Sequence, residues 1–426
     1  MFKKCIWILL FVGCDSPSST NPGIEKYPVS ASTLSKEIVR SQSNSKKAIA
    51  QPYVLLISLD GFRYDYAEKY HADILNGFQV SAKYMIPSFP TNTFPNHYTI
   101  VTGLYPGNHG LVSNSFYDTE KRQMYRMSDR SMVEDPDWYF GTPLWVLASQ
   151  QEMVSASMFW VGSETPVQGV YPTYYFKYDG SISHLDRINK VIQWLTLPED
   201  KRPHLITLYF SVIDSKGHKF GPESIEIDQA VKELNIELAD LMDKINGLDL
   251  NLNVIVVSDH GMLEVANEEP VNVSDYINLD KEVVSLSMPT MIYSDNKVLI
   301  DQVFEEMSVD ERVNVYYKEN LPDYYHYSLN SRIGDLIIMP KPNYIISTSN
   351  QIPSLGTSTH GWEPNTPEMG AIFYANGPAF KSGIVLEPFE NIHIYPMIAR
   401  ILNLNYHRDS IDGKIAVLEP ILKKTN

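Results

Sequence analysis

Several stretches of the chain are almost continuously apolar, the pattern typical of strands buried inside a parallel β-sheet. They cover residues 53–59, 155–160, 205–213, 252–258 and 371–374. Three of these predicted strands lead directly into a carboxylate: Asp60, Asp214 and Asp259. The carboxyl ends of parallel strands meet at one edge of a sheet, where ligands bind in open α/β folds. We therefore expect these three carboxylates to lie close together.

Between the predicted strands, apolar residues recur every three or four positions, which predicts amphipathic helices. The clearest helices cover residues 184–195, 227–245, 298–307 and 392–402. Alternation of strands and helices favours an α/β fold, with a mostly parallel central sheet covered by helices on both faces. Residues 264–358 are less regular, with short strand-like pieces at 283–286, 313–317 and 335–339. We interpret them as a smaller inserted α+β region.

The beginning of the chain has the pattern of an export signal. Residues 1–14 contain Lys3 and Lys4, then a short apolar run, then Gly13-Cys14, and the run is too short to span a bilayer. The sequence before Cys14 resembles a bacterial lipobox, which implies a lipid-anchored protein of the periplasm or cell surface. An ordinary secretory signal is the alternative. Residues 15–50 are rich in Ser, Asn and Pro, which predicts a flexible tether before a single catalytic domain at 51–426.

Composition excludes some classes of function. With 426 residues and 43% hydrophobic content, the chain can bury a large core. A net charge of -16 and a pI near 5.1 argue against binding of a nucleic-acid duplex. Cys5 and Cys14 are the only cysteines, so the mature fold has no disulfide. We expect a monomer that acts on a small molecule.

A proline-rich segment at 87–98 leads into the apolar residues Tyr98, Ile100, Val101 and Leu104. Their spacing predicts a short helix with Thr93 near its N-terminus and Pro95 in the first turn. Unpaired backbone N–H groups gather at such an end. Thr93 is therefore a helix cap, a phosphate contact or a nucleophile, and the spacing alone favours the cap.

Six residues near the predicted strand ends are candidate metal ligands: Asp60, Asp214, His218, Asp259, His260 and His360. Each one has an ordinary alternative, because a strand-end Asp often caps a helix and a His beside Gly is often a turn residue. Together they are enough for two metal sites. Carboxylate and imidazole ligands are typical of Zn²⁺, and three ligands per ion leave positions open for substrate and water.

These segments resemble the nucleotide pyrophosphatase/phosphodiesterase family of the alkaline phosphatase superfamily, with the lipobox suggesting a bacterial lipoprotein member. The resemblance rests on Asp-Gly-Phe-Arg at 60–63, Pro-Thr-Asn-Thr-Phe-Pro-Asn-His-Tyr at 90–98, Val-Thr-Gly-Leu-Tyr-Pro at 101–106, the Asp214 to Pro222 segment, Ser-Asp-His-Gly-Met at 258–262 and His-Gly at 360–361. It extends in order from about residue 54 to residue 413 and is weakest in the inserted region. It implies an alkaline-phosphatase-like fold.

The resemblance implies two Zn²⁺ ions and a threonine nucleophile. One ion belongs to Asp214, His218 and His360, and the other belongs to Asp60, Asp259 and His260, beside the hydroxyl of Thr93. Two divalent ions about 4 Å apart suit in-line displacement at phosphorus. A covalent phosphothreonine is then expected, and hydrolysis should retain configuration at phosphorus. By the same resemblance Asn114, otherwise a turn residue, holds a non-bridging oxygen together with the Thr93 N–H.

The substrate class also follows from the resemblance. Phe94 and Tyr178 are expected to stack on a nucleobase, with Trp160 and Glu164 nearby; many relatives carry Asp at the position of Glu164. Three acidic ligands leave two dications with a surplus of about one positive charge, which suits a diester monoanion. A monoester dianion usually needs an added Arg, and the nucleophile segment contains none.

Three functions are consistent with these residues. The first is hydrolysis of nucleotide phosphodiesters and phosphoanhydrides to nucleoside 5′-monophosphates. The second uses the same metal site on choline-headgroup lipids or glycerophosphodiesters, with Tyr side chains around a quaternary ammonium. The third is metal or nucleotide binding without turnover.

Overall fold

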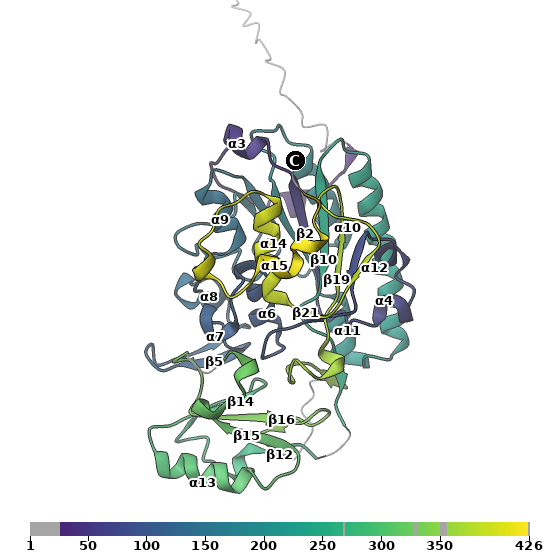
Figure 1. The fold of residues 1–426 in the computed structure, drawn as a ribbon. Coiled ribbons are helices and arrows are strands. Elements are labelled where there is room, and N and C mark those ends of the chain that lie inside the picture. The colour runs from purple at the N-terminus through teal and green to yellow at the C-terminus, as the bar shows by residue number, and fades with distance from the viewer. Residues whose placement is uncertain (1–25, 267–268, 328–329, 350–355, 425–426) are drawn as a thin grey trace, which may run out of the picture.

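A nine-stranded sheet forms the centre of the protein (Figure 1). The computed structural model describes residues 26–266, 269–327, 330–349 and 356–424. In spatial order the strands are β1 (Ile38–Val39), β8 (Tyr174–Tyr175), β7 (Ser155–Met158), β9 (Leu205–Phe210), β2 (Tyr53–Leu59), β10 (Leu252–Val257), β19 (Phe373–Asn376), β3 (Val80–Ala82) and β20 (Ile384–Leu386).

The middle of this sheet is parallel, as predicted. Strands β8, β7, β9, β2 and β10 run in one direction, whereas β19 pairs antiparallel with β10. Strand β9 is shorter than expected, because helix α11 (Val212–Phe220) begins two residues after Phe210. Asp214 therefore lies in the first turn of a helix and not at a strand end.

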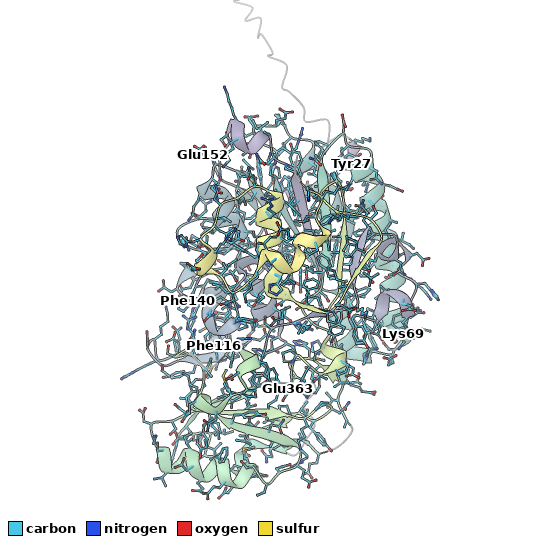
Figure 2. All side chains as sticks on the ribbon, viewed as in Figure 1. Tyr27, Lys69, Phe116, Phe140, Glu152 and Glu363 are labelled. Atoms are coloured by element: carbon cyan, nitrogen blue, oxygen red, sulfur yellow. The ribbon has the colours of Figure 1, made fainter. Side chains whose placement is uncertain are left out.

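Helices cover both faces of the sheet, which confirms the predicted α/β class. Alternate residues of β2 point to opposite faces: Val54 and Leu56 belong to one buried cluster, and Leu55 and Ile57 belong to the other. The first cluster contains residues of α6 (Thr93–Thr102), α9 (Leu144–Gln150) and α14 (Ile394–Ile401), and the second contains residues of α10 (His184–Leu195) and α12 (Ile225–Asn246). Figure 2 shows the side chains on this ribbon.

The inserted region forms a separate small sheet, which lies below the main body in Figure 1. Its antiparallel strands follow the order β13 (Val283–Ser285), β14 (Thr290–Tyr293), β16 (Leu336–Pro340) and β15 (Val313–Tyr317). Helix α13 (Lys297–Met307) packs against this sheet through Ile300 and Val303. Residues 264–358 thus contain the expected strands and a helix.

Short elements connect these parts. The strands are β4 (Met85–Ile86), β5 (Ser115–Asp118), β6 (Gln123–Arg126), β11 (Leu263–Glu264), β12 (Val271–Asn272), β17 (Ile346–Ser347), β18 (Ser358–Thr359) and β21 (Phe389–Glu390). The helices are α2 (Ala31–Leu34), α3 (Lys46–Ile49), α4 (Tyr66–Lys69), α5 (Asp73–Asn76), α7 (Pro106–His109), α8 (Arg130–Val133) and α15 (Ile415–Leu418).

The prediction of a flexible tether is wrong for residues 26–50. This segment contains α2, β1 and α3, and β1 pairs with the edge strand β8. Glu37 accepts hydrogen bonds from Lys190 Nζ at 2.6 Å and from Trp194 Nε1 at 2.7 Å. Polar contacts and serine caps hold the segment, so apolar periodicity could not reveal it. The predicted signal at 1–14, Cys14 and residues 15–25 lie outside the described residues. In the described part of the chain, no helix is long and apolar enough to cross a bilayer.

Candidate active site

Tight backbone contacts bring the ends of three sheet segments together. Asp60 follows β2, and Asp259 and His260 follow β10. The Asp214 N–H donates to the Asp60 carbonyl at 3.0 Å, and the Gly61 N–H donates to Asp259 Oδ1 at 3.2 Å. The three predicted carboxylates therefore lie at one edge of the sheet.

Gly61 permits this close approach. Its φ is +67°, and a Cβ at this position would lie 2.9 Å from the Asp214 Cα. We expect Gly61→Ala to lower the free energy of unfolding by about 2 to 5 kcal/mol. This is the sum of the cost of a left-handed backbone conformation for alanine and the cost of the overpacked contact with Asp214. Denaturant unfolding measures this loss. Gly169→Ala is the matched control, because Gly169 has a φ of +77° with no atom within 4 Å. Equal losses in the two variants would contradict the packing argument.

Three histidines present the same ring nitrogen to the site. In each ring Nδ1 faces a backbone carbonyl: His218 faces Ser358 at 2.9 Å, His260 faces Gly261 at 2.8 Å and His360 faces Thr91 at 3.0 Å. A carbonyl only accepts, so Nδ1 carries the proton and Nε2 keeps its lone pair. This arrangement is typical of metal-binding imidazoles.

The three carboxylates each keep one buried oxygen without a hydrogen-bond donor in the described part of the chain: Asp60 Oδ1, Asp214 Oδ1 and Asp259 Oδ2. Burial and repulsion from Asp259 and Asp214 raise the pKa of Asp60 well above its usual value. Burial opposes ionisation of Asp259, but His260 and His97 hold its pKa well below the usual range. Such a cluster of buried acceptors fits a bound cation.

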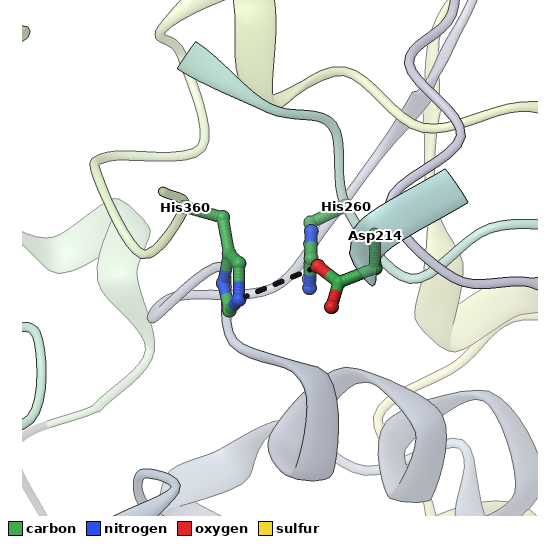
Figure 3. A group of neighbouring side chains, drawn as sticks. All are labelled: Asp214, His260 and His360. Carbon is green, nitrogen blue, oxygen red and sulfur yellow. Dashed lines mark ion pairs between the residues drawn. The ribbon is translucent and has the colours of Figure 1, made fainter. Parts of the chain in front are cut away.

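The ligand atoms form two overlapping groups, in each of which all atoms lie within 4.8 Å of one another. One group is Asp60, Asp259 and His260, the set that the family resemblance implies for one ion. The other contains Asp214, His260 and His360, where the prediction had His218 in place of His260. Figure 3 shows the rings of His260 and His360 side by side next to Asp214, and their centroids are 3.6 Å apart. His218 Nε2 lies 3.3 Å from Asp214 Oδ1, adjacent to this group.

Burial and neighbouring charges together shift the pKa values of these imidazoles. The pKa of His360 falls to about 3 because of burial and the neighbouring His260. His260 is buried as well, yet Asp259 raises its pKa. A neutral His360 is ready to serve as a ligand through Nε2.

Thr93 is the first residue of α6, and the helix cap is Asn92. The cap interpretation of Thr93 is therefore wrong. Thr93 Oγ1 lies 3.1 Å from His260 Nε2, so the hydroxyl faces the candidate metal ligands. Asn92 instead donates from Nδ2 to the Met288 carbonyl and to Ser113 Oγ. A phosphate contact and a nucleophile are the two roles that remain for Thr93.

Asn114 is oriented by the first turn of α6. Its Oδ1 accepts a hydrogen bond from the Phe94 N–H at 3.0 Å. Its Nδ2 has no acceptor among the residues that the structure describes, and Asn114 lines a cavity together with His218 and His360. The amide donor is thus available to an oxygen bound near Thr93.

The predicted base-binding residues have different surroundings. Tyr178 is 42% exposed, with its ring centroid 6.0 Å from that of Tyr209, and Phe94 is half-buried. Glu164 is buried; it pairs with Arg130 and accepts the Tyr178 N–H at 2.9 Å. Trp160 is buried and donates from Nε1 to the His97 carbonyl at 2.8 Å. Glu164 and Trp160 thus hold neighbouring segments in place, and their contact with a base stays a prediction.

Two further residues support the site and were missed from the sequence. His97 is fully buried, with Nε2 2.8 Å from Ser58 Oγ and Nδ1 3.3 Å from Asp259 Oδ2. Tyr209 donates its hydroxyl proton to Asp60 Oδ2. His97 follows Thr93 by four residues, so helical spacing could have placed it beside Thr93. Tyr209 lies within an apolar strand and gives no such signal.

One sheet edge gathers six candidate metal ligands beside the threonine that begins α6, an arrangement consistent with the class of metal-dependent phosphoryl-transfer sites. A profile of the type I phosphodiesterase / nucleotide pyrophosphatase family matches residues 54–363. The chain belongs to this family, which confirms the family predicted from the sequence.

Relatives support the assignment. Human ectonucleotide pyrophosphatase/phosphodiesterase family member 1 is 34% identical over 371 residues, covering 83% of this chain but 40% of its own length. The chain thus spans less than half of that relative. An uncharacterized pyrophosphatase/phosphodiesterase of Schizosaccharomyces pombe is 34% identical over 388 residues, 86% of this chain and 80% of that protein.

Solved structures share the fold. Human ectonucleotide pyrophosphatase/phosphodiesterase 5 matches with a TM-score of 0.82 and 28% identity, covering 87% of this chain and 100% of that one. The inactive murine protein in complex with AMP matches with a TM-score of 0.81 and 27% identity, over 88% of this chain and all of its own. The expected alkaline-phosphatase-like α/β fold is confirmed.

Proposed function

We propose that the protein hydrolyses nucleotide phosphodiesters and phosphoanhydrides and releases nucleoside 5′-monophosphates. The observation that carries the proposal is the position of the Thr93 hydroxyl, at a helix N-terminus and 3.1 Å from His260 in the cluster of candidate metal ligands. Family membership and the AMP complex of a murine relative support the same substrate class.

Two Zn²⁺ ions fit the donor set. Asp60, Asp259 and His260 would hold one, and Asp214, His218 and His360 would hold the other; the three buried carboxylate oxygens without donors support this assignment. When bound, such ions lower the pKa of a nearby hydroxyl or water and neutralise charge on phosphate oxygens. Tyr209 positions Asp60 by a hydrogen bond to its Oδ2, and His97 lies beside Asp259, with Nδ1 3.3 Å from Oδ2.

Thr93, Asn114 and the N–H groups at the start of α6 then have separate roles in the reaction. Thr93 Oγ1, after losing its proton to solvent, forms a bond to phosphorus as the bond to the leaving oxygen breaks. The N–H groups at the start of α6 and Asn114 Nδ2 stabilise the non-bridging oxygens, on which negative charge increases. Water later displaces Thr93 from the phosphothreonine, so one water is consumed and a nucleoside 5′-monophosphate is released. Two inversions retain the configuration at phosphorus.

A comparison of three nitrophenyl substrates tests the function. We expect kcat/KM to be highest for a nitrophenyl nucleotide diester, and lower for nitrophenyl phosphate and for nitrophenyl phosphorylcholine. The exposed ring of Tyr178 offers a stacking surface worth about 1 to 3 kcal/mol per base, which only the first substrate can use. If the diester is the poorest of the three, the nucleotide function is wrong, and a preference for phosphorylcholine supports the choline-headgroup alternative.

A further inference from the structure

A second cavity lies at the edge of the main sheet opposite the candidate active site. It has a volume of about 630 Å³ and is lined by Pro52 and Asn251, which come directly before β2 and β10. Asp60, Asp259 and His260 follow the other ends of the same two strands. Because β2 and β10 run parallel, this cavity and the candidate metal ligands lie at opposite ends of the sheet.

The charge of this cavity is opposite in sign to that of the whole chain. Its lining residues include one carboxylate, Glu419, and four exposed cations: Lys381, Arg400, Lys423 and Lys424. None of the four cations forms an ion pair with another described residue. The chain has a net charge of -16, so a local excess of positive charge is unusual on its surface. Such an excess around a cavity favours binding of an anion.

Backbone hydrogen bonds build the C-terminal segment into the wall of the cavity. The Lys423 N–H donates to the Ala379 carbonyl at 2.8 Å. The Lys381 N–H donates to the Ile421 carbonyl at 2.9 Å. On the other side, the buried Asn253 accepts a hydrogen bond from the Ala379 N–H at 2.8 Å through Oδ1. The cations are therefore carried by a segment that is part of the packed fold.

Apolar side chains form much of the remaining wall. Ile401 and Leu422 are buried at the cavity, and Pro378 and Pro52 line it as well. A neighbouring cavity of about 430 Å³ shares Arg400 with the first and adds Arg408 to its lining. Apolar walls beneath exposed cations suit an amphiphile, in which an anionic group is joined to a hydrocarbon part.

The first described residues lie at the same end of the molecule. Gln193 donates to the Tyr27 carbonyl at 2.8 Å, and Lys244 Nζ lies 5.9 Å from the centroid of the Tyr27 ring. Gln193 and Lys244 are near the ends of α10 and α12, which lead into the beginnings of β9 and β10. Tyr27 is near the top of Figure 2, as the C-terminus is in Figure 1. A lipid on the predicted Cys14 would thus hold this end near a membrane.

We propose that this cavity binds the phosphate group of an anionic phospholipid and seats this end of the protein on a membrane surface. Arg400 and Lys423 bind the phosphate oxygens, since guanidinium and ammonium groups both pair with phosphate. The apolar wall receives the adjoining glycerol and the first carbons of an acyl chain. The candidate active site then faces away from the membrane, where soluble substrates reach it.

Partition of the full chain onto lipid vesicles tests the inference. Vesicles of phosphatidylcholine alone are compared with vesicles of equal parts phosphatidylcholine and phosphatidylglycerol, so an N-terminal lipid contributes equally to both. We expect the wild type to prefer the phosphatidylglycerol vesicles. Combining Arg400→Ala with Lys423→Ala should reduce this preference about 25-fold, because each cation near an anionic surface strengthens binding about fivefold. Lys381 stays unchanged, since its Nζ donates to the Pro420 carbonyl at 2.6 Å.

A matched control removes the same charge from the inserted region at the other end of the molecule. Lys281→Ala combined with Lys297→Ala changes two exposed lysines there and should leave the preference for phosphatidylglycerol unchanged. Both double variants should keep the wild-type Tm, which shows that they are folded.

Three outcomes would overturn the inference. The first is an unchanged preference in the Arg400→Ala and Lys423→Ala double variant. The second is an equal loss in the control, which would show that only net charge matters. The third is calorimetric binding of inorganic phosphate that this double variant loses, without any preference for phosphatidylglycerol; the cavity would then bind a soluble phosphate compound. None of these measurements involves turnover, so the proposed function is tested separately.

Discussion

Thr93→Ala is expected to lower kcat for a nitrophenyl nucleotide diester by at least about 10⁴-fold, the scale seen when a catalytic nucleophile is removed. The reason is geometric: Thr93 Oγ1 lies 3.1 Å from His260 Nε2, at the start of α6. The six candidate ligands are unaltered in the variant, so its metal content should equal that of the wild type. Steady-state kinetics and elemental analysis of the same samples measure both quantities.

Thr93→Ser is the matched control, because it keeps the hydroxyl and removes one methyl group. We expect Thr93→Ser to keep a measurable fraction of wild-type kcat while Thr93→Ala has almost none. A Thr93→Ala protein with unchanged turnover would show that the hydroxyl is not the nucleophile. A wild type that binds metal and nucleotide but turns over none of the substrates would support the binding-protein hypothesis.

Much of the fold was predictable because the apolar runs and the helical spacing of apolar residues marked separate, clearly bounded segments of the chain. Helix α10 has the predicted bounds, and β2 and β10 begin where their apolar runs begin. The predicted end of strand β9 was too late, because Val212 and Ile213 continue the apolar run but already belong to helix α11. An apolar pair fits a buried strand and a buried first turn equally well, so periodicity could not decide between them.

The candidate metal ligands could be named from the sequence and the resemblance, but their arrangement relative to one another could not. Carboxylates after apolar strands mark a sheet edge, and the resemblance supplied the histidines. The overlap of the two ligand groups at His260 depends on the stacking of its ring against His360, a contact between residues 100 positions apart. Likewise, the hydrogen bond from Tyr209 to Asp60 crosses between neighbouring strands. Such contacts follow from tertiary packing and leave no local pattern in the sequence.

Exhaustive chelation is expected to abolish activity and to lower Tm by about 5 to 10 °C, since a ligand present at 1,000 times its Kd stabilises a fold by about 4 kcal/mol. The physical cause is the convergence of Asp60, Asp214 and Asp259, which the fold holds together and which repel one another without a cation. Burial and this repulsion raise the pKa of Asp60. Scanning calorimetry and activity assays of the chelated protein, before and after addition of Zn²⁺, measure both effects.

Asp214→Asn is the control variant for the chelation experiment, because it removes one of the three converging negative charges at nearly constant side-chain volume. We expect the chelated variant to unfold at a higher temperature than the chelated wild type, although the variant is inactive with Zn²⁺ present. The order reverses on addition of Zn²⁺, because only the wild type keeps the Asp214 carboxylate beside His218 and His360. A folded wild-type sample that stays fully active after chelation would contradict the two-metal site. If neither the chelator nor Zn²⁺ changed the Tm, the ions would have to bind elsewhere.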